Sequence, residues 1–367
     1  MKFIFRLFRA LLETKSIRYV LVEKEEPITI GVEIECYTIL TEECKISRRV
    51  ILPDVKSPEA GERFTVDKSI GSEYVTKPFE SLREALQAIS SGLGKYAGSS
   101  LVSNALPLPV GGWNDRFAGA HFHIGFKDKG LSREEAGSLA NYIHDHIPFI
   151  IAVSANSPVW RRRVTGYSSN RLLRGGGKYC IPITKGGLNQ NHYREVNFNP
   201  ENKHKPSTLE LRVCDSNIPP YVCAVMTILK ILALAWRNGK DACNDLTHEA
   251  YLEARAEAAR RGAAAKLYWG GNTVTVGEYL TLLLDNYSEE AGVLDIPGDV
   301  AEAFSLLEVE WNNAEALRLA AIKLRGRFGG DWERKMAFKL ASALKTLLNG
   351  GSLREYHEAL GLRIPRV

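Results

Sequence analysis

Three short stretches, far apart in this 367-residue chain, alternate apolar and polar side chains. They are residues 30–35, 120–124 and 208–215, and in each the alternate positions are large and apolar. The intervening side chains are Glu33 and Glu35, His121 and His123, and Glu210 and Arg212. Successive side chains of a strand point to opposite faces, so each stretch predicts a strand with one buried and one polar face. We expect the three strands to share one sheet, whose polar face gathers the charged groups.

The first pair of carboxylates indicates a cation site. Glu33 and Glu35 point the same way and are separated by roughly 6.6 Å along a strand. Two such charges repel by about 4 kcal/mol at a distance of about 4 Å and an effective dielectric constant near 20. A hard divalent cation removes that repulsion, and oxygen ligands suit Mg²⁺, with Mn²⁺ as an alternative. Taken alone, the pair also fits a solvated strand face that pairs with Lys or Arg.

The other two strands add imidazoles and a fixed positive charge. His121 and His123 could be hydrogen-bonded interior histidines, or the iron or zinc ligands of a cupin-type barrel. The cupin pattern needs a nearby glutamate, and this chain supplies only Asp128. Arg212 presents a planar fork that suits phosphoryl oxygens, although a salt bridge to Glu210 explains that pair equally well. Together the three strands predict that the polar face of the sheet binds metal ions and phosphate groups.

The composition predicts a globular protein with small-molecule partners. A net charge of +5 without a basic stripe among aromatic residues argues against a nucleic-acid partner. The six cysteines form no CxxC pair, which favours reduced thiols and a cytoplasmic location, with a Cys36–Cys44 disulfide as the open alternative. The longest apolar run, residues 221–236, contains Lys230 and is short for a span of about 20 residues. We therefore expect a buried helix and no transmembrane segment. The sequence leaves a homo-oligomer open.

The order of patterns predicts an α+β chain with three parts. Residues 1–16 read as an amphipathic helix docked on the body, with contact to a membrane surface as the alternative. Residues 17–240 form the predicted catalytic core, and residues 241–367 a helical region packed on it. Within the core we expect a hairpin of strands 193–199 and 207–214, one helix over 132–155, and a long irregular, arginine-rich stretch over 156–191. The later helices are expected at about 219–237, 247–265, 276–287, 299–326, 331–348 and 352–361.

Five motifs in order resemble the carboxylate–amine ligases of the glutamate–cysteine ligase family, within the glutamine synthetase superfamily. The motifs are residues 31–35, Asp67-Lys68-Ser69 with Glu73, residues 119–125, residues 154–160 with 165–171, and residues 208–215. The resemblance implies a glutamine synthetase-like catalytic fold, with a curved, mainly antiparallel sheet and flanking helices. It also implies ATP as co-substrate.

The resemblance assigns roles by position. Glu33, Glu35, Glu73, His121 and Glu210 would hold two or three Mg²⁺ ions. Nucleotide phosphates would meet His123 and Asn197, the phosphoryl group in transfer would meet Arg212 and Arg194, and the substrates would meet Arg171, Tyr167 and Asn156. Arg171 is expected on a loop that closes over the site.

The sequence departs from the pattern of this family at two points. Ile34 stands where many relatives carry a third acid, and the Arg-x-x-Asn stretch from Arg194 to Asn197 resembles the broader amidoligase branch. The expected activity is an ATP-dependent amide-forming ligase that works through an acyl phosphate, with glutamate as the expected acid and a small amine as its partner. Two alternatives remain. One is a phosphotransferase like the guanidino kinases, and the other is a non-catalytic protein that binds nucleotide or amino acid.

Overall fold

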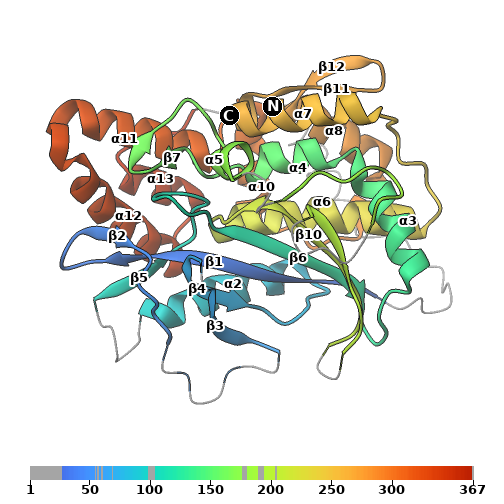
Figure 1. The fold of residues 1–367 in the computed structure, drawn as a ribbon, viewed down its shortest axis with the longest axis horizontal. Coiled ribbons are helices and arrows are strands. Elements are labelled where there is room, and N and C mark those ends of the chain that lie inside the picture. Colours follow the sequence, from blue (N-terminus) through green and yellow to red (C-terminus); the bar gives the residue numbers. More distant parts are fainter. Residues whose placement is uncertain are drawn as a thin grey trace.

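The computed structural model describes residues 27–53, 55, 58, 61–67, 69–97, 104–175, 180–188, 194–202 and 205–365. The predicted N-terminal helix over 1–16 lies outside these ranges, and so does the start of the predicted strand over 193–199. Within these ranges the chain forms an α+β fold (Figure 1). The predicted fold class is confirmed.

An eight-stranded sheet, antiparallel throughout, organises the fold. Its path is β3-β4-β1-β6-β10-β9, and β2 and β5 also pair with β1. The central strand β1 (Ile28–Leu40) is 13 residues long, so its first part pairs with β4 and β6 and its last part with β2 and β5. The other strands are β2 (Lys45–Ser47), β3 (Arg63–Asp67), β4 (Gly71–Val75), β5 (Ala105–Leu108), β6 (Gly119–Phe126), β9 (Val196–Asn199) and β10 (Thr208–Asp215). The β9–β10 pairing confirms the predicted hairpin.

The strand register brings the predicted apolar positions together on one face. Val32 and Leu211 both pair with Phe122, and Ile30 and Leu209 both pair with Ile124. Each of these side chains is at most 1% exposed. The alternation in the sequence therefore predicted correctly which side chains enter the core.

A layer of helices covers the apolar face, with α6 (Pro219–Arg237) at its centre (Figure 1). Two prolines occupy the first turn of α6, where their missing N–H groups cost no helical bond. The helix has the length and hydropathy that a membrane span would need, yet 89% of that window is buried within the protein. In the described part of the chain it is the one helix of this kind, and it packs against α2 (Leu82–Ala97) and β1. The prediction of a buried core helix is confirmed.

Two predictions about the middle of the chain are wrong. The expected helix over 132–155 is interrupted, because α3 (Arg133–His144) ends and α4 (Ile147–Ser154) begins with Pro148 in its first turn. The expected irregular stretch after it contains a short hairpin of β7 (Val159–Trp160) and β8 (Arg163–Val164), then the helix α5 (Asn170–Arg174). In Figure 1, β7 and α5 lie above β1 in the view.

The chain after residue 240 is mainly helical, as predicted, but several elements differ from the prediction. The predicted helix over 299–326 is two helices, because Glu310 adopts a left-handed φ of 58° and Asn312 caps the second helix. The hairpin of β11 and β12 is not predicted from the sequence. The elements are α7 (His248–Arg261), β11 (Lys266–Trp269), β12 (Asn272–Thr275), α8 (Val276–Asn286), α9 (Ser288–Gly292), α10 (Gly298–Glu308), α11 (Asn313–Phe328), α12 (Trp332–Leu348) and α13 (Leu353–Ala359).

Two hydrophobic cores join these helices to the sheet. The larger core combines the apolar sheet face with α2, α4, α6, α7 and α8, and the smaller one combines β2 and β5 with α11, α12 and α13. Both cores therefore cross the predicted boundary at residue 240, and that boundary stays a prediction. All six cysteines are free, and four of them are buried.

Candidate active site

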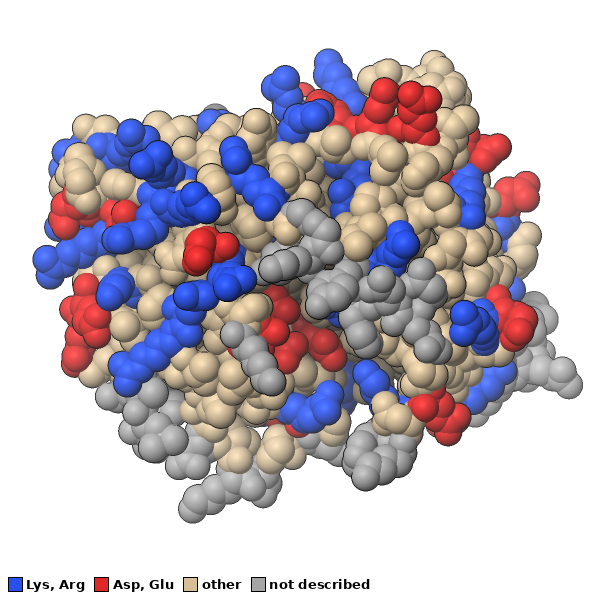
Figure 2. Space-filling view, in the orientation of Figure 1, with Lys and Arg blue, Asp and Glu red and all other residues tan. Residues whose placement is uncertain are grey.

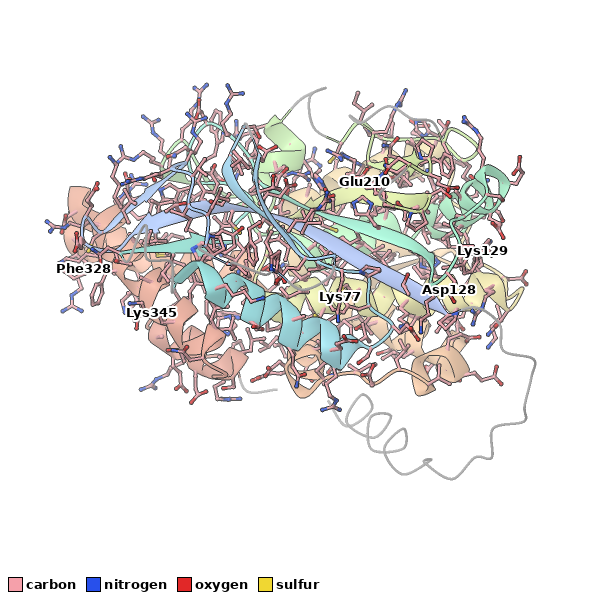
Figure 3. All side chains as sticks on the ribbon, turned by 90° about the horizontal axis from the view of Figure 1, so that it is seen from below. Lys77, Asp128, Lys129, Glu210, Phe328 and Lys345 are labelled. Carbon is pink, nitrogen blue, oxygen red and sulfur yellow. The ribbon has the colours of Figure 1, made fainter. Side chains whose placement is uncertain are left out.

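The polar face of the sheet carries the predicted acidic and imidazole side chains next to one another. Glu33 of β1 stands opposite His121 of β6, and His123 of β6 stands opposite Glu210 of β10. On the other side of β1, Glu35 pairs with Glu73 of β4. Figure 2 shows acidic side chains in a hollow near the middle of this face, with Lys and Arg around it. Figure 3 shows Glu210 on the strands at the middle of the molecule, away from Phe328 and Lys345.

Three of these side chains have the geometry of a metal site. One ligand atom each from Glu33, His123 and Glu210 lies within 4.8 Å of the other two. The Nε2 atom of His123 is 3.3 Å from Oε1 of Glu33, but it is buried and forms no hydrogen bond. Two carboxylate oxygens and an imidazole nitrogen suit Mg²⁺ or Mn²⁺, with the nitrogen favouring Mn²⁺ more. The residues therefore fit the divalent cation that the sequence predicts, and they add His123 to its candidate ligands.

His121 lies among three carboxylates. Its Nδ1 atom is 3.6 Å from Glu33 Oε2 and 3.6 Å from Glu210 Oε1, and its Nε2 atom is 3.9 Å from Glu35 Oε1. The side chain is 4% exposed. His121 can thus either bind a cation or stabilise the surrounding negative charge, and its role as a ligand stays a prediction.

The histidines keep two of the four carboxylates ionised. Burial raises the pKa of Glu33, but the close imidazoles of His121 and His123 outweigh burial and bring this pKa well below its ordinary value. Burial likewise opposes ionisation of Glu210, while the charges of His121 and Arg212 lower its pKa overall. The carboxylates of Glu33 and Glu210 therefore provide two negative charges at the centre of the site.

The other two carboxylates are held toward the neutral form. Burial raises the pKa of Glu73 to about 8, and the nearby charges of Glu33 and Glu35 add to the effect. Burial also raises the pKa of Glu35, although its Oε2 atom accepts a hydrogen bond of 2.6 Å from the backbone N–H of Gly119. A divalent cation beside these groups would favour their ionised forms.

The metal-free protein is expected to lose stability as the pH rises, because of Glu73. Its pKa is about 8 in the folded chain, against an ordinary value of 4.5. Between these values the unfolded chain has released the proton that the folded chain still holds, so the free energy of unfolding falls with rising pH. Because Glu73 is only partly buried, we expect a fall of roughly 1 kcal/mol between about pH 5 and pH 8. Thermal unfolding across this range checks the slope, and an unchanged slope in Glu73→Gln would contradict the assignment.

A β-bulge places Arg212 beside the acidic cluster. The pairing of β10 with β6 shifts by one residue between Leu211 and Cys214, which leaves Arg212 at the irregularity. Its Nη1 atom donates to Oε1 of Glu210, and its backbone N–H donates to the carbonyl of Glu195 at 2.8 Å. The guanidinium therefore lies at the edge of the carboxylates, where the sequence predicts it.

Arg171 differs from its predicted setting. It lies in the helix α5 and is 3% exposed, so it is not carried on an open loop. Its Nη2 and Nη1 atoms donate to the carbonyls of Arg212 at 2.9 Å and Val213 at 3.2 Å. The Arg171 side chain thus fixes the backbone of the bulge, and direct contact with a substrate stays a prediction.

The motif after α4 forms a buried hydrogen-bond network around Asp215. This carboxylate accepts hydrogen bonds from the backbone N–H of Asn156 at 2.8 Å and from the hydroxyls of Ser157 at 2.7 Å and Ser169 at 3.0 Å. The side-chain amide of Asn156 is fully buried and donates to two backbone carbonyls. The motif therefore joins α4 and α5 to the end of β10. Asn156 supports the fold in this structure, and its predicted contact with substrate remains untested.

The structure adds polar groups around Glu210 and His123 that the sequence analysis missed. Asn199 donates to Glu210 Oε2 at 3.0 Å, and the Thr208 hydroxyl is 3.3 Å from His123 Nδ1. The predicted residue Asn197 is fully buried, stands opposite Glu210, and has an Oδ1 atom without a hydrogen bond. The alternation of Asn197 and Asn199 along β9 is the sequence pattern from which Asn199 could have been predicted. Arg194 lies outside this group and donates to the Pro182 carbonyl at 3.0 Å.

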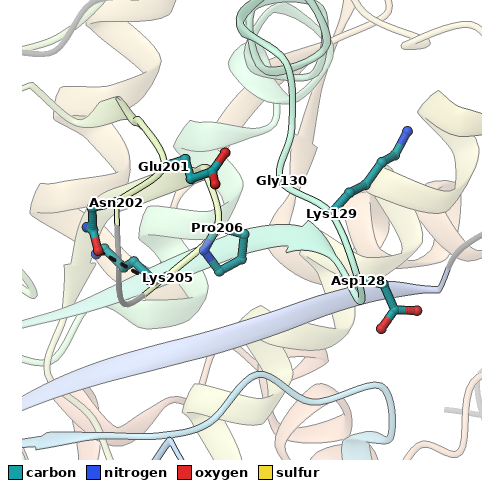
Figure 4. A pocket seen from close by; sticks show the side chains of 7 residues that line it. All are labelled: Asp128, Lys129, Gly130, Glu201, Asn202, Lys205 and Pro206. Atoms are coloured by element: carbon teal, nitrogen blue, oxygen red, sulfur yellow. Dashed lines mark hydrogen bonds between the residues drawn. The ribbon is translucent and has the colours of Figure 1, made fainter.

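A separate pocket lies at one end of the sheet (Figure 4). It has a volume of about 450 Å³ and lies between the segment after β6 and the β9–β10 connection. Its lining mixes both signs of charge and comprises Asp128, Lys129, Gly130, Glu201, Asn202, Lys205 and Pro206. None of these residues is a predicted site residue, so the pocket adds no ligand to the cluster.

Solved structures of similar fold include two ligases and a synthetase. A glutamate–cysteine ligase from Francisella tularensis, solved in complex with AMP, aligns over 92% of this chain and 93% of its own, with a TM-score of 0.59 and 13% identity. A bifunctional glutathione synthetase from Pasteurella multocida aligns over 91% of this chain and 55% of its own, with a TM-score of 0.54 and 13% identity. The ligase PafA, in complex with the prokaryotic ubiquitin-like protein Pup, aligns over 92% and 80%, with a TM-score of 0.50 and 13% identity. At this identity the likeness shows the fold alone.

Sequence comparison points to one family among these proteins. Residues 109–174 match the sequence model of Glutamate-cysteine ligase family 2. The "Putative glutamate--cysteine ligase 2" of Corynebacterium jeikeium is 44% identical over 55 residues, which are 15% of this chain and 13% of that protein. The "Putative glutamate--cysteine ligase 2-1" of Streptomyces avermitilis is 26% identical over 170 residues, 41% of this chain and 46% of that protein. The resemblance to glutamate–cysteine ligases is confirmed, and the chain spans less than half the length of these curated relatives.

Proposed function

We propose that this chain is an ATP-dependent carboxylate–amine ligase with glutamate as its expected acid substrate. The observation that carries the proposal is the convergence of Glu33, His123 and Glu210 within 4.8 Å. Arg212 extends this group with a fixed positive charge. The curated relatives bear names of the same class, and the Francisella tularensis enzyme of this fold was solved with AMP.

The cluster would hold the divalent cations that such a reaction requires. Glu33, Glu210 and His123 form the first candidate group, and Glu35, Glu73 and His121 lie beside them. When bound, Mg²⁺ would neutralise the phosphate charges of ATP and of the departing ADP. The number of ions belongs to the proposal.

The chain's own side chains would orient and neutralise the reacting groups. The terminal phosphoryl group of ATP passes to a carboxylate oxygen of the acid, which gives an acyl phosphate and ADP. The amine nitrogen then attacks the acyl carbon, phosphate leaves, and the amine releases a proton. Arg212 would stabilise the phosphoryl group in transfer, and Asn197 would contact the nucleotide phosphates. Arg194 lies two residues before β9 and, with Arg212, would stabilise the phosphoryl group and the acid. Positioning and charge stabilisation are the main catalytic effects in such transfers.

The test is a product assay with the full chain. ATP, MgCl₂, glutamate and a panel of small amines are incubated with the protein, and products are identified by mass spectrometry. Hydroxylamine in place of the amine should trap the acyl phosphate as a hydroxamate. ADP formation that depends on the acid, together with a condensed product, would support the ligase. A phosphorylated substrate without condensation would indicate a phosphotransferase. No turnover that depends on an acid would indicate a binding protein.

Arg212→Lys is expected to lower kcat with little change in the KM for ATP. Lysine keeps the positive charge but loses the planar fork that contacts Glu210 and could span two phosphoryl oxygens. We expect a loss of roughly 10²-fold in kcat, less than the 10³–10⁵-fold effect of a missing arginine in known phosphoryl transfers. Steady-state kinetics with varied ATP checks this split. A variant with wild-type kcat would remove Arg212 from the transfer step.

A further inference from the structure

Four side chains of the segment from β7 to α5 form an alternating stack of cations and rings, which we call the arginine–aromatic ladder: Arg161, Trp160, Arg174 and Tyr167. The guanidinium carbons of Arg161 and Arg174 each lie 4.5 Å from the centre of the Trp160 ring. Arg174 also lies 5.4 Å from the ring of Tyr167. Both arginines and Tyr167 are exposed. The ladder therefore presents two ordered guanidinium groups to the outside of the molecule.

The turn that carries Arg161 has a backbone conformation that is unfavourable for arginine. Arg161 and Arg162 form the two-residue turn between β7 and β8, with φ values of 48° and 59°. Such turns favour asparagine and glycine, because bulky residues disfavour the left-handed region. Two hydrogen bonds of 2.8 Å hold the turn, from the N–H of Arg161 to Asn114 and from the N–H of Arg162 to Trp113. Retained strain of this kind is typical of residues with a function beyond the fold.

The ladder stands close to the acidic cluster. Arg174 follows Arg171 by one turn of α5, and Arg171 donates to the carbonyls of the β10 bulge. Arg171 also lies on the polar face of the sheet. A Cβ atom added to Gly119 would lie 2.6 Å from Nη2 of Arg171 and 3.0 Å from Nε2 of His121. The helix that carries Arg174 therefore borders the acidic cluster through Arg171.

The chemistry of the ladder suits carboxylates. Rings that hold a guanidinium in place leave its in-plane N–H groups free to bind a planar anion. The Nε atom of Arg174 donates to Asn170 Oδ1 at 2.9 Å, and within the described residues its two Nη groups have no acceptor. Bases of nucleic acids need an open aromatic face, and two guanidinium groups already lie over Trp160. An acidic peptide therefore fits this surface better than a nucleic acid does.

We propose that the acid substrate is a peptide with several carboxylates, one of which enters the acidic cluster while others bind Arg161 and Arg174. This inference rests on the proposed ligase function and specifies its substrate class. It places recognition of the extended substrate outside the metal-binding group, on residues that take no part in phosphoryl transfer.

The test measures binding and turnover separately. A fluorescein-labelled pentaglutamate peptide is titrated with the full chain in the presence of MgCl₂, and binding is followed by fluorescence anisotropy. The test variant is Arg161→Gln with Arg174→Gln. The matched control is Arg325→Gln with Arg327→Gln, which removes two exposed charges from the end of α11. We expect the Kd to rise at least about tenfold in the test variant and to stay within about twofold in the control.

The remaining measurements distinguish a site for acidic peptides from the alternatives. Wild-type ADP formation should favour pentaglutamate over free glutamate by about tenfold in kcat/KM, and this preference should fall in the test variant. Equal peptide binding by the test variant and the wild type would overturn the proposal. Displacement of the peptide by a short oligoribonucleotide but not by unlabelled pentaglutamate would overturn it in favour of a nucleic-acid surface. Peptide binding that requires the ladder, without any turnover, would support the subsite and reject the ligase function.

Discussion

Replacing Glu33 by glutamine is expected to abolish amide formation while leaving the fold intact. Glu33 contacts both His121 and His123, and it belongs to the group whose ligand atoms lie within 4.8 Å. Glutamine preserves the size of the side chain but removes the charge that a divalent cation needs. We expect activity to fall by roughly 10³-fold or more, because charge neutralisation of the phosphates depends on the bound cation. The measurement is condensed product formed per minute at saturating ATP, MgCl₂ and glutamate.

Stability should change much less than activity. Glu33→Gln relieves part of the repulsion that raises the pKa of Glu73, but it also removes the interactions with His121 and His123 that lower the pKa of Glu33. The two effects oppose each other, so the metal-free variant should still show a cooperative thermal unfolding transition. His121→Ala should likewise lose activity, since it leaves three carboxylates without their shared neighbour. Glu358→Gln, an exposed site on α13, is the matched control and should behave as wild type. Wild-type turnover in Glu33→Gln would refute the proposal that Glu33 helps to bind the metal ion.

The sequence predicted the polar face because strand alternation is a local property. Glu33, His121 and Glu210 sit in stretches whose period of two fixes their side of the sheet, and the antiparallel register then brings them together. The roles of individual ligands did not follow from the sequence, because His121 and His123 share a face. The three-dimensional structure is needed to show that His123, with Glu33 and Glu210, forms the three-residue group.

Features that depend on single irregular residues escaped prediction. The bulge at Arg212 reflects one extra residue in β10, and no local pattern marks it. Arg171 looked like part of an open loop because its short helix is stabilised by distant contacts with Arg212 and Val213. The break between α10 and α11 depends on a left-handed glutamate, Glu310, a conformation that sequence patterns rarely reveal.

A buried ion pair connects the C-terminal helices to the site. Glu195, which is fully buried, accepts hydrogen bonds from Arg255 Nε at 2.7 Å, from the Tyr251 hydroxyl, and from the backbone N–H of Ile183 at 2.9 Å. Its own carbonyl accepts the backbone N–H of Arg212 at 2.8 Å. The helix α7, which carries Tyr251 and Arg255, therefore helps to fix the backbone of Arg212.

Arg255→Met should destabilise the protein by about 3–5 kcal/mol, because it leaves the buried Glu195 carboxylate without its positive partner. Adding Glu195→Gln should recover part of that loss, since the double variant buries no unpaired charge. Urea unfolding of the wild type, both single variants and the double variant gives the coupling energy. Arg255 Nη2 also donates to the Cys180 carbonyl at 2.6 Å, and this bond is lost in Arg255→Met and in the double variant alike. If Arg255 also positions Arg212, the double variant should therefore regain stability yet keep a lowered kcat. A free energy of unfolding within about 1 kcal/mol of wild type in Arg255→Met would show that this pair contributes little to the fold.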